Sequence, residues 1–193
     1  ENPFSALKVM INGAFVYKGA LGYTLFYTTS FIFTGLAVAI AFHAKLFNIG
    51  AEGQASLGGL GATLIAFALS SLPGIIALPL AVAGAALFGA AWGVVPGYLQ
   101  AKRDSHIVIT TIMFNFIAAA LLVWLLAGIM LEPGQFSPQS SLLPEQTWLP
   151  KIHEILGWVN IKTTPTPLNA SFLVALLTCL FFWVLVWRTR LGF

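Results

Sequence analysis

A short polar stretch, "FNIGAEGQ" at positions 47–54, holds the side chains of this sequence that are best suited to bind a polar ligand. Asn48 and Gln54 are carboxamides, which both donate and accept hydrogen bonds, and Glu52 is a carboxylate. Long apolar runs flank the stretch on both sides. A charged side chain at the centre of a bilayer costs about 2.5–3.5 kcal/mol on insertion scales, so these residues need a protected environment.

Two arrangements provide that environment for residues 46–56, and the sequence leaves both open. In the first, the stretch is a cytoplasmic turn in which Asn48 caps the next helix and Glu52 occupies its first turn, where the helix dipole favours an anion. In the second, the stretch interrupts a helix that lines a watery cavity, where half-helix ends can hold a substrate. In the second arrangement, Asn48, Glu52 and Gln54 are candidates for the path of a transported solute.

Two further sets of polar residues lie near the ends of apolar runs. Thr111 and Asn115 are four residues apart and therefore share one face of a helix, where they either bond a neighbouring helix or line a polar path. Lys102, Arg103 and Asp104 form a basic loop, "AKRDSH". Such a loop either anchors the chain beside anionic lipid or contacts a cytoplasmic partner protein.

Several chemistries are excluded by missing motifs. The sequence has no Ser-His-Asp set, no H-E-x-x-H and no phosphate-binding P-loop, so we predict no catalytic residue and no cofactor of its own. No pair of histidines has metal-ligand spacing, and the lone Cys179 cannot form an internal disulfide. The nine Lys and Arg residues mostly flank apolar runs, which indicates topology anchors rather than nucleic-acid binding.

The elements that must position these residues are membrane-spanning helices. The chain has 193 residues, of which 59% are hydrophobic and 8% are charged, whereas soluble domains carry about 25% charged residues. The long apolar runs do not alternate, so we predict an all-α polytopic transmembrane bundle. The predicted spans are 23–42, 51–70, 75–95, 107–131 and 170–187.

The charges of the connections predict an orientation. Lys45, Lys102, Arg103, Arg188 and Arg190 fall on one side, which the positive-inside rule makes cytoplasmic. Residues 132–168 then form an external loop, with a short amphipathic helix expected near "PKIHEILGWV", and residues 1–20 form an external amphipathic segment. We expect residues 1–193 to be a single transmembrane domain from a longer protein, since neither end reads as a natural terminus.

Two long segments carry a family resemblance. "FTGLAVAIAFHAKLFNIGAEGQ" (33–54) and "GAAWGVVPGYLQAKRDSHIVITTIMFNFIA" (89–118) resemble the signatures of bacterial ABC importer permeases of the simple-sugar and nucleoside type, which are similar to ribose permeases. "NPFSALKVMINGAF" and "WRTRLGF" also resemble that family, so the resemblance covers nearly the whole chain except the long loop. His43 and Lys45 depart from the family's usual Arg and Gly, and Phe residues flank Asn115 in place of Leu and Tyr.

The resemblance implies an inner-membrane permease subunit that moves a nucleoside or simple sugar inward. It implies a cytoplasmic ATP-binding subunit, an extracytoplasmic solute-binding protein and a second permease subunit as partners. It also implies that the main coupling segment lies outside this chain.

The sequence leaves open two alternative functions. One is a gradient-driven carrier or channel, and the other, less favoured, is a membrane scaffold or intramembrane enzyme. The carrier usually needs several buried acids, and only Glu52 is near the membrane interior.

Overall fold

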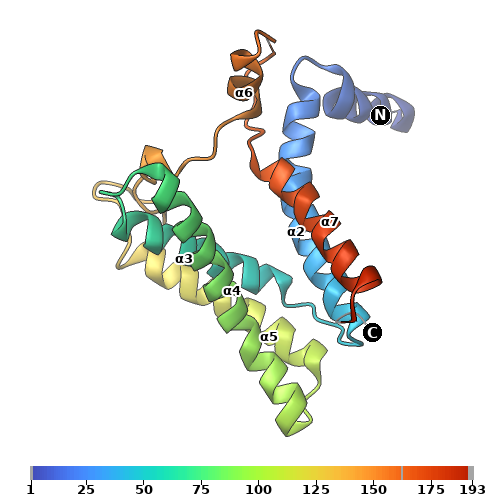
Figure 1. Ribbon diagram of the computed structural model, residues 1–193, viewed down its shortest axis with the longest axis vertical. Helices are drawn as coiled ribbons and strands as arrows, with labels where there is room; N and C mark the ends of the chain where they lie inside the picture. The colour runs from blue at the N-terminus through green and yellow to red at the C-terminus, as the bar shows by residue number, and fades with distance from the viewer. Residues whose placement is uncertain (1, 162, 191–193) are drawn as a thin grey trace. The chain divides into compact units, whose positions relative to one another are not determined.

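The computed structural model describes residues 2–161 and 163–190, and within them every regular element is helical apart from one isolated β-bridge (Figure 1). The all-α fold class is therefore confirmed. The elements are α1 (Pro3–Ile11), the π-helix η1 (Asn12–Val16), α2 (Ala20–His43), α3 (Ala51–Ala68), α4 (Gly74–Arg103), α5 (Ile107–Ala127), the 3₁₀-helix η2 (Glu145–Thr147), α6 (Ile152–Trp158) and α7 (Ser171–Arg188).

The predicted spans correspond closely to helices. Of the helices that the structure describes, α2, α4, α5 and α7 are long and apolar enough to cross a membrane. Helix α3 begins at Ala51 as predicted and has 18 residues, but it is not one of those four. The polar residues and glycines of α3 lower its mean hydropathy. Several of the same residues also lie against the neighbouring helices. The chain is thus a multi-pass membrane protein.

Two predicted span ends are wrong, and one is that of the fourth span, which was expected to reach Leu131, whereas α5 ends at Ala127. The third span was expected to end at Val95, but α4 continues through Pro96 to Arg103, so Lys102 and Arg103 lie in its last turn rather than in a loop. Asp104 follows as the C-cap in the left-handed conformation, with φ 56°. Proline is tolerated inside membrane helices because neighbouring groups can satisfy the freed carbonyl. At about 1.5 Å per residue, this 30-residue helix is longer than the hydrocarbon core is thick.

The chain divides into two compact units, which are described separately. The first contains Glu1–Leu36 and Leu149–Phe193, and the second contains Ala37–Trp148. In the first unit, an antiparallel bridge between Lys151 and Asn169 closes the segment that carries α6. The short helix expected near 150–159 is therefore confirmed as α6.

In the second unit, α3 packs against α4 and α5 around a small core. Leu57 and Leu60 of α3 and Ala118 of α5 are buried, and Trp92 of α4 packs against them. The 3₁₀-helix η2 returns to the turn between α3 and α4, where the Gln146 side chain donates a hydrogen bond to the Ser70 carbonyl.

Glycines bring α3 and α4 close together. A Cβ added at Gly61 would lie 2.6 Å from the Gly84 carbonyl oxygen, and one at Gly58 would lie 3.2 Å from that of Ala85. Only residues without a side chain permit this backbone approach, which is how helices associate in lipid, where apolar burial gives little driving force. Gly97 of α4 takes no part in such an approach, since a Cβ there would meet nothing within 4 Å.

Candidate functional site

The candidate site is centred on the connection between α2 and α3, residues 44–50. Helix α2 ends in a Schellman motif, in which the Leu46 amide donates to the Ala41 carbonyl at 2.9 Å and the Lys45 amide donates to that of Phe42 at 2.9 Å. Lys45 takes the left-handed position of this motif, with φ 60°. Glycine adopts that conformation without strain, which gives a physical reason for the glycine usual in the resembling permeases.

The second half of the connection is arranged by Asn48. Its side-chain oxygen accepts a hydrogen bond from the Gly50 amide at 2.8 Å, immediately before α3 begins at Ala51. Gly50 is the N-cap residue and α3 has no side-chain cap, so the expected capping by Asn48 is wrong. Asn48 instead orders the turn from two positions earlier in the chain. A Cβ at Gly50 would lie 2.9 Å from that same oxygen and 3.2 Å from the Cβ of Thr111, so the turn requires glycine there.

Helix α5 holds this turn in place through two side chains. Asn115 donates from Nδ2 to the Ile49 carbonyl at 3.0 Å and accepts at Oδ1 from the Gly53 amide at 2.9 Å. The Thr111 hydroxyl, with 1% of the residue exposed, accepts from the Ile49 amide at 3.3 Å and donates to the Ile107 carbonyl of its own helix at 2.8 Å. The structure therefore brings Thr111 and Asn115 onto the polar stretch as interhelical clamps.

Glu52 and Gln54 have different surroundings. Glu52 lies in the first turn of α3, is exposed, and makes no hydrogen bond or ion pair with the residues that the structure describes. Gln54 is half-buried against α4, where a Cβ at Gly93 would lie 3.0 Å from its Nε2. Of the predicted site residues in the stretch, Glu52 is thus the one with an accessible charged group.

Trp92 is a member of this cluster that sequence reasoning missed. A Cβ at Gly53 would lie 3.1 Å from its indole Nε1 and 2.9 Å from the Asn115 side-chain oxygen. Its ring centre is 5.2 Å from that of Phe114. Within the described part of the chain, the buried Nε1 has no hydrogen-bond partner. The available signal was the position of this tryptophan between Gly89 and Gly93, the glycines that let α4 approach α3.

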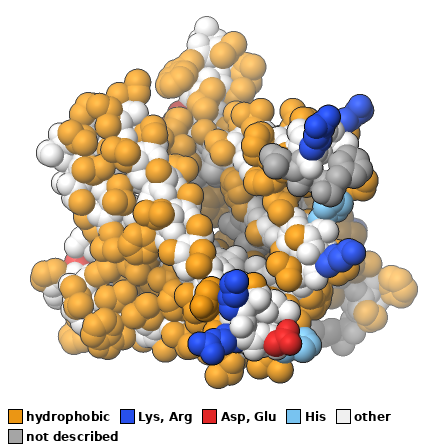
Figure 2. Space-filling model, turned by 60° about the horizontal axis from the view of Figure 1, so that its bottom comes forward, with side chains coloured by type: hydrophobic (Ala, Val, Ile, Leu, Met, Phe, Trp, Pro, Cys, Tyr) orange, Lys and Arg blue, Asp and Glu red, His pale blue; other side chains and the backbone are white. Residues whose placement is uncertain are grey.

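Lys102, Arg103 and Asp104 are separate from this cluster. All three are exposed at the turn between α4 and α5, and His106 is the N-cap of α5. Figure 2 shows Lys and Arg side chains next to an acidic and a histidine side chain on a face that is otherwise largely hydrophobic. A polar turn between two apolar helices is the arrangement expected at a membrane surface.

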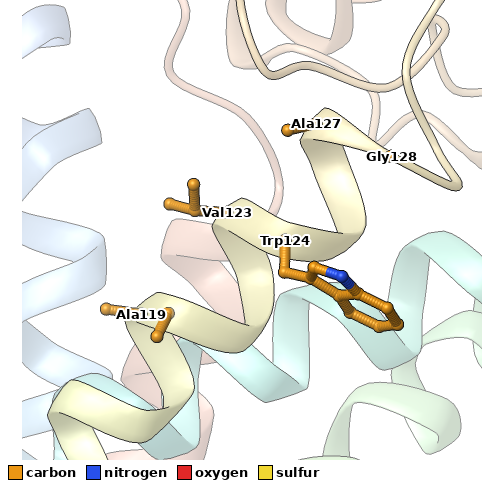
Figure 3. A pocket seen from close by; sticks show the side chains of 6 residues that line it. Ala119, Val123, Trp124, Ala127 and Gly128 are labelled. Atoms are coloured by element: carbon orange, nitrogen blue, oxygen red, sulfur yellow. The ribbon is translucent and has the colours of Figure 1, made fainter.

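Two pockets formed by the described residues lie away from the cluster. A shallow pocket of about 640 Å³ lies along the outside of α5 and is lined by Ala119, Ala120, Val123, Trp124, Ala127 and Gly128. In Figure 3, the Val123 and Trp124 side chains project toward opposite sides of that helix. The other pocket, of about 390 Å³, lies within the first unit. Residues of η1 and the start of α2 line one side of it, and residues of α6 and the segment that follows α6 line the other.

The apolar helices, the glycine-mediated packing and the clamped polar turn define a polytopic membrane protein. The chain belongs to the family described as "Branched-chain amino acid transport system / permease component", whose sequence profile matches residues 20–193. This family consists of transport components rather than enzymes, so the predicted family and the predicted lack of enzymatic activity are confirmed.

Three curated relatives are similar along essentially the whole chain. A glucose ABC transporter permease protein of Haloferax volcanii is 34% identical, with 100% of this chain and 50% of the relative covered. A guanosine ABC transporter permease protein of Bacillus subtilis is 33% identical, with 98% and 52% covered. A nucleoside ABC transporter permease protein of Lactococcus lactis is 28% identical, with 100% and 52% covered. The chain spans about half the length of these relatives, and no solved structure matches it.

Proposed function

We propose that this chain forms part of the membrane-spanning subunit of an ATP-driven ABC importer in the plasma membrane, and that its solute is a nucleoside or a simple sugar. The relatives are named for glucose, guanosine and nucleosides, which are uncharged and rich in hydrogen-bonding groups. Energy comes from a cytoplasmic ATP-binding subunit, because this sequence has no P-loop. A solute-binding protein delivers the ligand, and a second permease subunit completes the path.

The depth of Glu52 is the observation that best supports a transport path here. The neighbouring Gly53 bonds Asn115, which is eight residues into α5 from Ile107, or about 12 Å along the helix. Gly53 also contacts Trp92, which is eleven residues before Arg103, or about 16 Å from that end of α4. The headgroup region is only about 5–8 Å thick, so both measures put Glu52 below it when the basic turn lies at the surface.

An exposed carboxylate at that depth needs water or a polar partner, because lipid would not tolerate it. We therefore assign Glu52 to a hydrated path or to the boundary with the remainder of the permease. Asn115 and Thr111 are positioning residues, since their polar atoms are occupied in holding the turn. Asn48 orders the turn, and Gln54 lies next to the path along α4. The α2–α3 connection is then both a turn ordered by Asn48 and part of a cavity wall.

The turn between α4 and α5 is the proposed contact with the ATPase in this part of the permease. Lys102 and Arg103 extend from the last turn of α4, and Asp104 follows in a left-handed conformation. Helix α4 is long enough to carry this turn beyond the hydrocarbon core. The principal coupling segment is expected in the part of the relatives that this chain does not cover.

Reconstitution tests the function directly. The full-length permease, with its ATPase, binding protein and partner permease, is placed in proteoliposomes with ATP inside and a mixture of nucleosides and sugars outside. Mass spectrometry then identifies the accumulated solute. We expect ATP-dependent uptake of one class. Uptake driven by a proton or sodium gradient through the permease alone would instead identify a gradient-driven carrier.

The variant Glu52→Gln tests the path in the same assay. Loss of a charged hydrogen bond to the solute or its water should reduce uptake about tenfold, since about 1.4 kcal/mol corresponds to a factor of ten. Glu145→Gln, in the exposed η2 segment, is the matched control and should transport normally. Equal uptake by both variants, with normal assembly, would remove Glu52 from the path while leaving the importer function intact.

A further inference from the structure

The N-terminal segment formed by α1 and η1 exposes almost all of its apolar side chains. Phe4 is 79% exposed and Met10 is 69% exposed, and no residue of α1 or η1 is buried. The other large apolar side chains of the two elements are also exposed: Leu7, Val9, Ile11, Phe15 and Val16. Such a concentration of apolar surface indicates an apolar neighbour.

The polar residues of α1 follow a single narrow stripe. Ser5, Lys8 and Asn12 are spaced three and four residues apart, which places them on one face of the helix. Phe4, Leu7 and Ile11 form a parallel stripe with the same spacing. Leu7 and Met10 lie on the far side of the helix from this polar stripe, so α1 has a narrow polar face with one lysine and a broad apolar face, which suits a helix that lies in a membrane surface.

The connection to α2 places this segment at the level of the bilayer surface. Helix α2 is long and apolar enough to cross the membrane and begins at Ala20, only four residues after η1 ends. The Thr24 hydroxyl, in the second turn of α2, donates to the Ala14 carbonyl of η1 at 2.8 Å. Tyr17 and Tyr23, both exposed, flank the helix start as expected for an interfacial aromatic belt.

We propose that α1 and η1 lie in the plane of the membrane, with their apolar side chains inserted among the lipids of the leaflet where α2 begins. Together they contain 14 residues, about 21 Å at helical rise, which is too short to cross the hydrocarbon core. Exposed Lys8 in α1 and exposed Lys18, two residues after η1 ends, fit anionic headgroups. This in-plane anchor is independent of the solute and of the energy source.

Site-directed spin labelling of the full-length permease in vesicles of phosphatidylcholine and phosphatidylglycerol tests the proposal. Single cysteines replace Leu7, Met10 or Ile11 on the apolar face, and Ser5 or Lys8 on the polar stripe, in a background with Cys179→Ala and no other cysteine. Each label's collision rates with oxygen, which concentrates in lipid, and with a water-soluble nickel chelate are then measured. All five positions are exposed, so the labels should not disturb the fold.

We expect oxygen collisions to exceed nickel collisions at least threefold at positions 7, 10 and 11, and the reverse at positions 5 and 8. Low collision rates with both reagents on the apolar face would show that another protein surface covers it, and would overturn the proposal. High nickel collision rates at all five positions would place the segment in water and would equally overturn it. Because no transport is measured, either result leaves the proposed importer function untouched.

Discussion

At the scale of single residues, Asn115 shows how one side chain organises a turn on a distant part of the chain. It bonds the backbone of Ile49 and Gly53 on opposite sides of the point where α3 begins. A side chain that satisfies one carbonyl and one amide at the end of a helix replaces partners that neither lipid nor the helix itself provides. These two bonds hold the start of α3, and with it Glu52, against α5.

Asn115→Leu is expected to destabilise the permease by about 1–3 kcal/mol, because it leaves the buried Gly53 amide without an acceptor. Unfolding in detergent measures the change. Thr110→Val is the control on the same helix, since that hydroxyl bonds only the His106 and Ile107 carbonyls at its own helix start. If the two variants lose the same stability, Asn115 does not clamp the turn.

At the scale of helices, the close approach of α3 to α4 depends on which glycines face the partner. Gly61 lies against the Gly84 backbone and the Phe88 side chain, whereas a Cβ at Gly59 would meet nothing within 4 Å. Both glycines occur in the same short run of the sequence. Only the rotation of α3 about its axis distinguishes them, and that rotation is set by packing.

Gly61→Ala should therefore destabilise the helix pair by about 1–3 kcal/mol, because its Cβ would lie 2.6 Å from a backbone oxygen that cannot move alone. Gly59→Ala should be neutral or slightly stabilising, since alanine favours a helix over glycine. Thermal unfolding of the two variants in the same detergent makes the comparison. The reverse order of stabilities would mean that α3 presents a different face to α4.

At the scale of the whole molecule, the charge distribution predicts which membrane side each connection faces. The turn that follows α4 is basic, whereas the connection after α5 carries Glu132 and Glu145 together with several prolines. Positively charged connections are retained in the cytoplasm during insertion. The side of the membrane that each connection faces does not depend on how the helices pack within either compact unit. Chemical labelling of the intact protein in cells can establish it directly.

Ser137→Cys in the long loop should react with a membrane-impermeant maleimide in intact cells, because this residue is exposed and lies on the predicted external side. Lys102→Cys, at the exposed end of α4, should react only after the cells are permeabilised. Gel shifts of the labelled full-length permease report both reactions. The opposite pattern would invert the predicted topology and place the basic turn away from the ATPase.

The class of the protein, its long helices and its family follow from the sequence alone. Apolar runs of membrane length predict spanning helices because hydropathy and length are local properties that neighbouring elements hardly change. The start of α3 at Ala51 was predictable for the same reason, since Asn48 and Gly50 form a local turn signal. The FNIGAEGQ segment also indicates the family without any information on tertiary contacts.

Only the tertiary structure decided what the polar residues of the cluster contact. Asn115 and Gly53 are 62 residues apart, and no local pattern predicts which face of α5 meets the α2–α3 turn. The role of Trp92 was hidden for the same reason, because the sequence shows a tryptophan between glycines but not the helix opposite it. Contacts between helices depend on their rotation and crossing, which result from packing the whole unit at once.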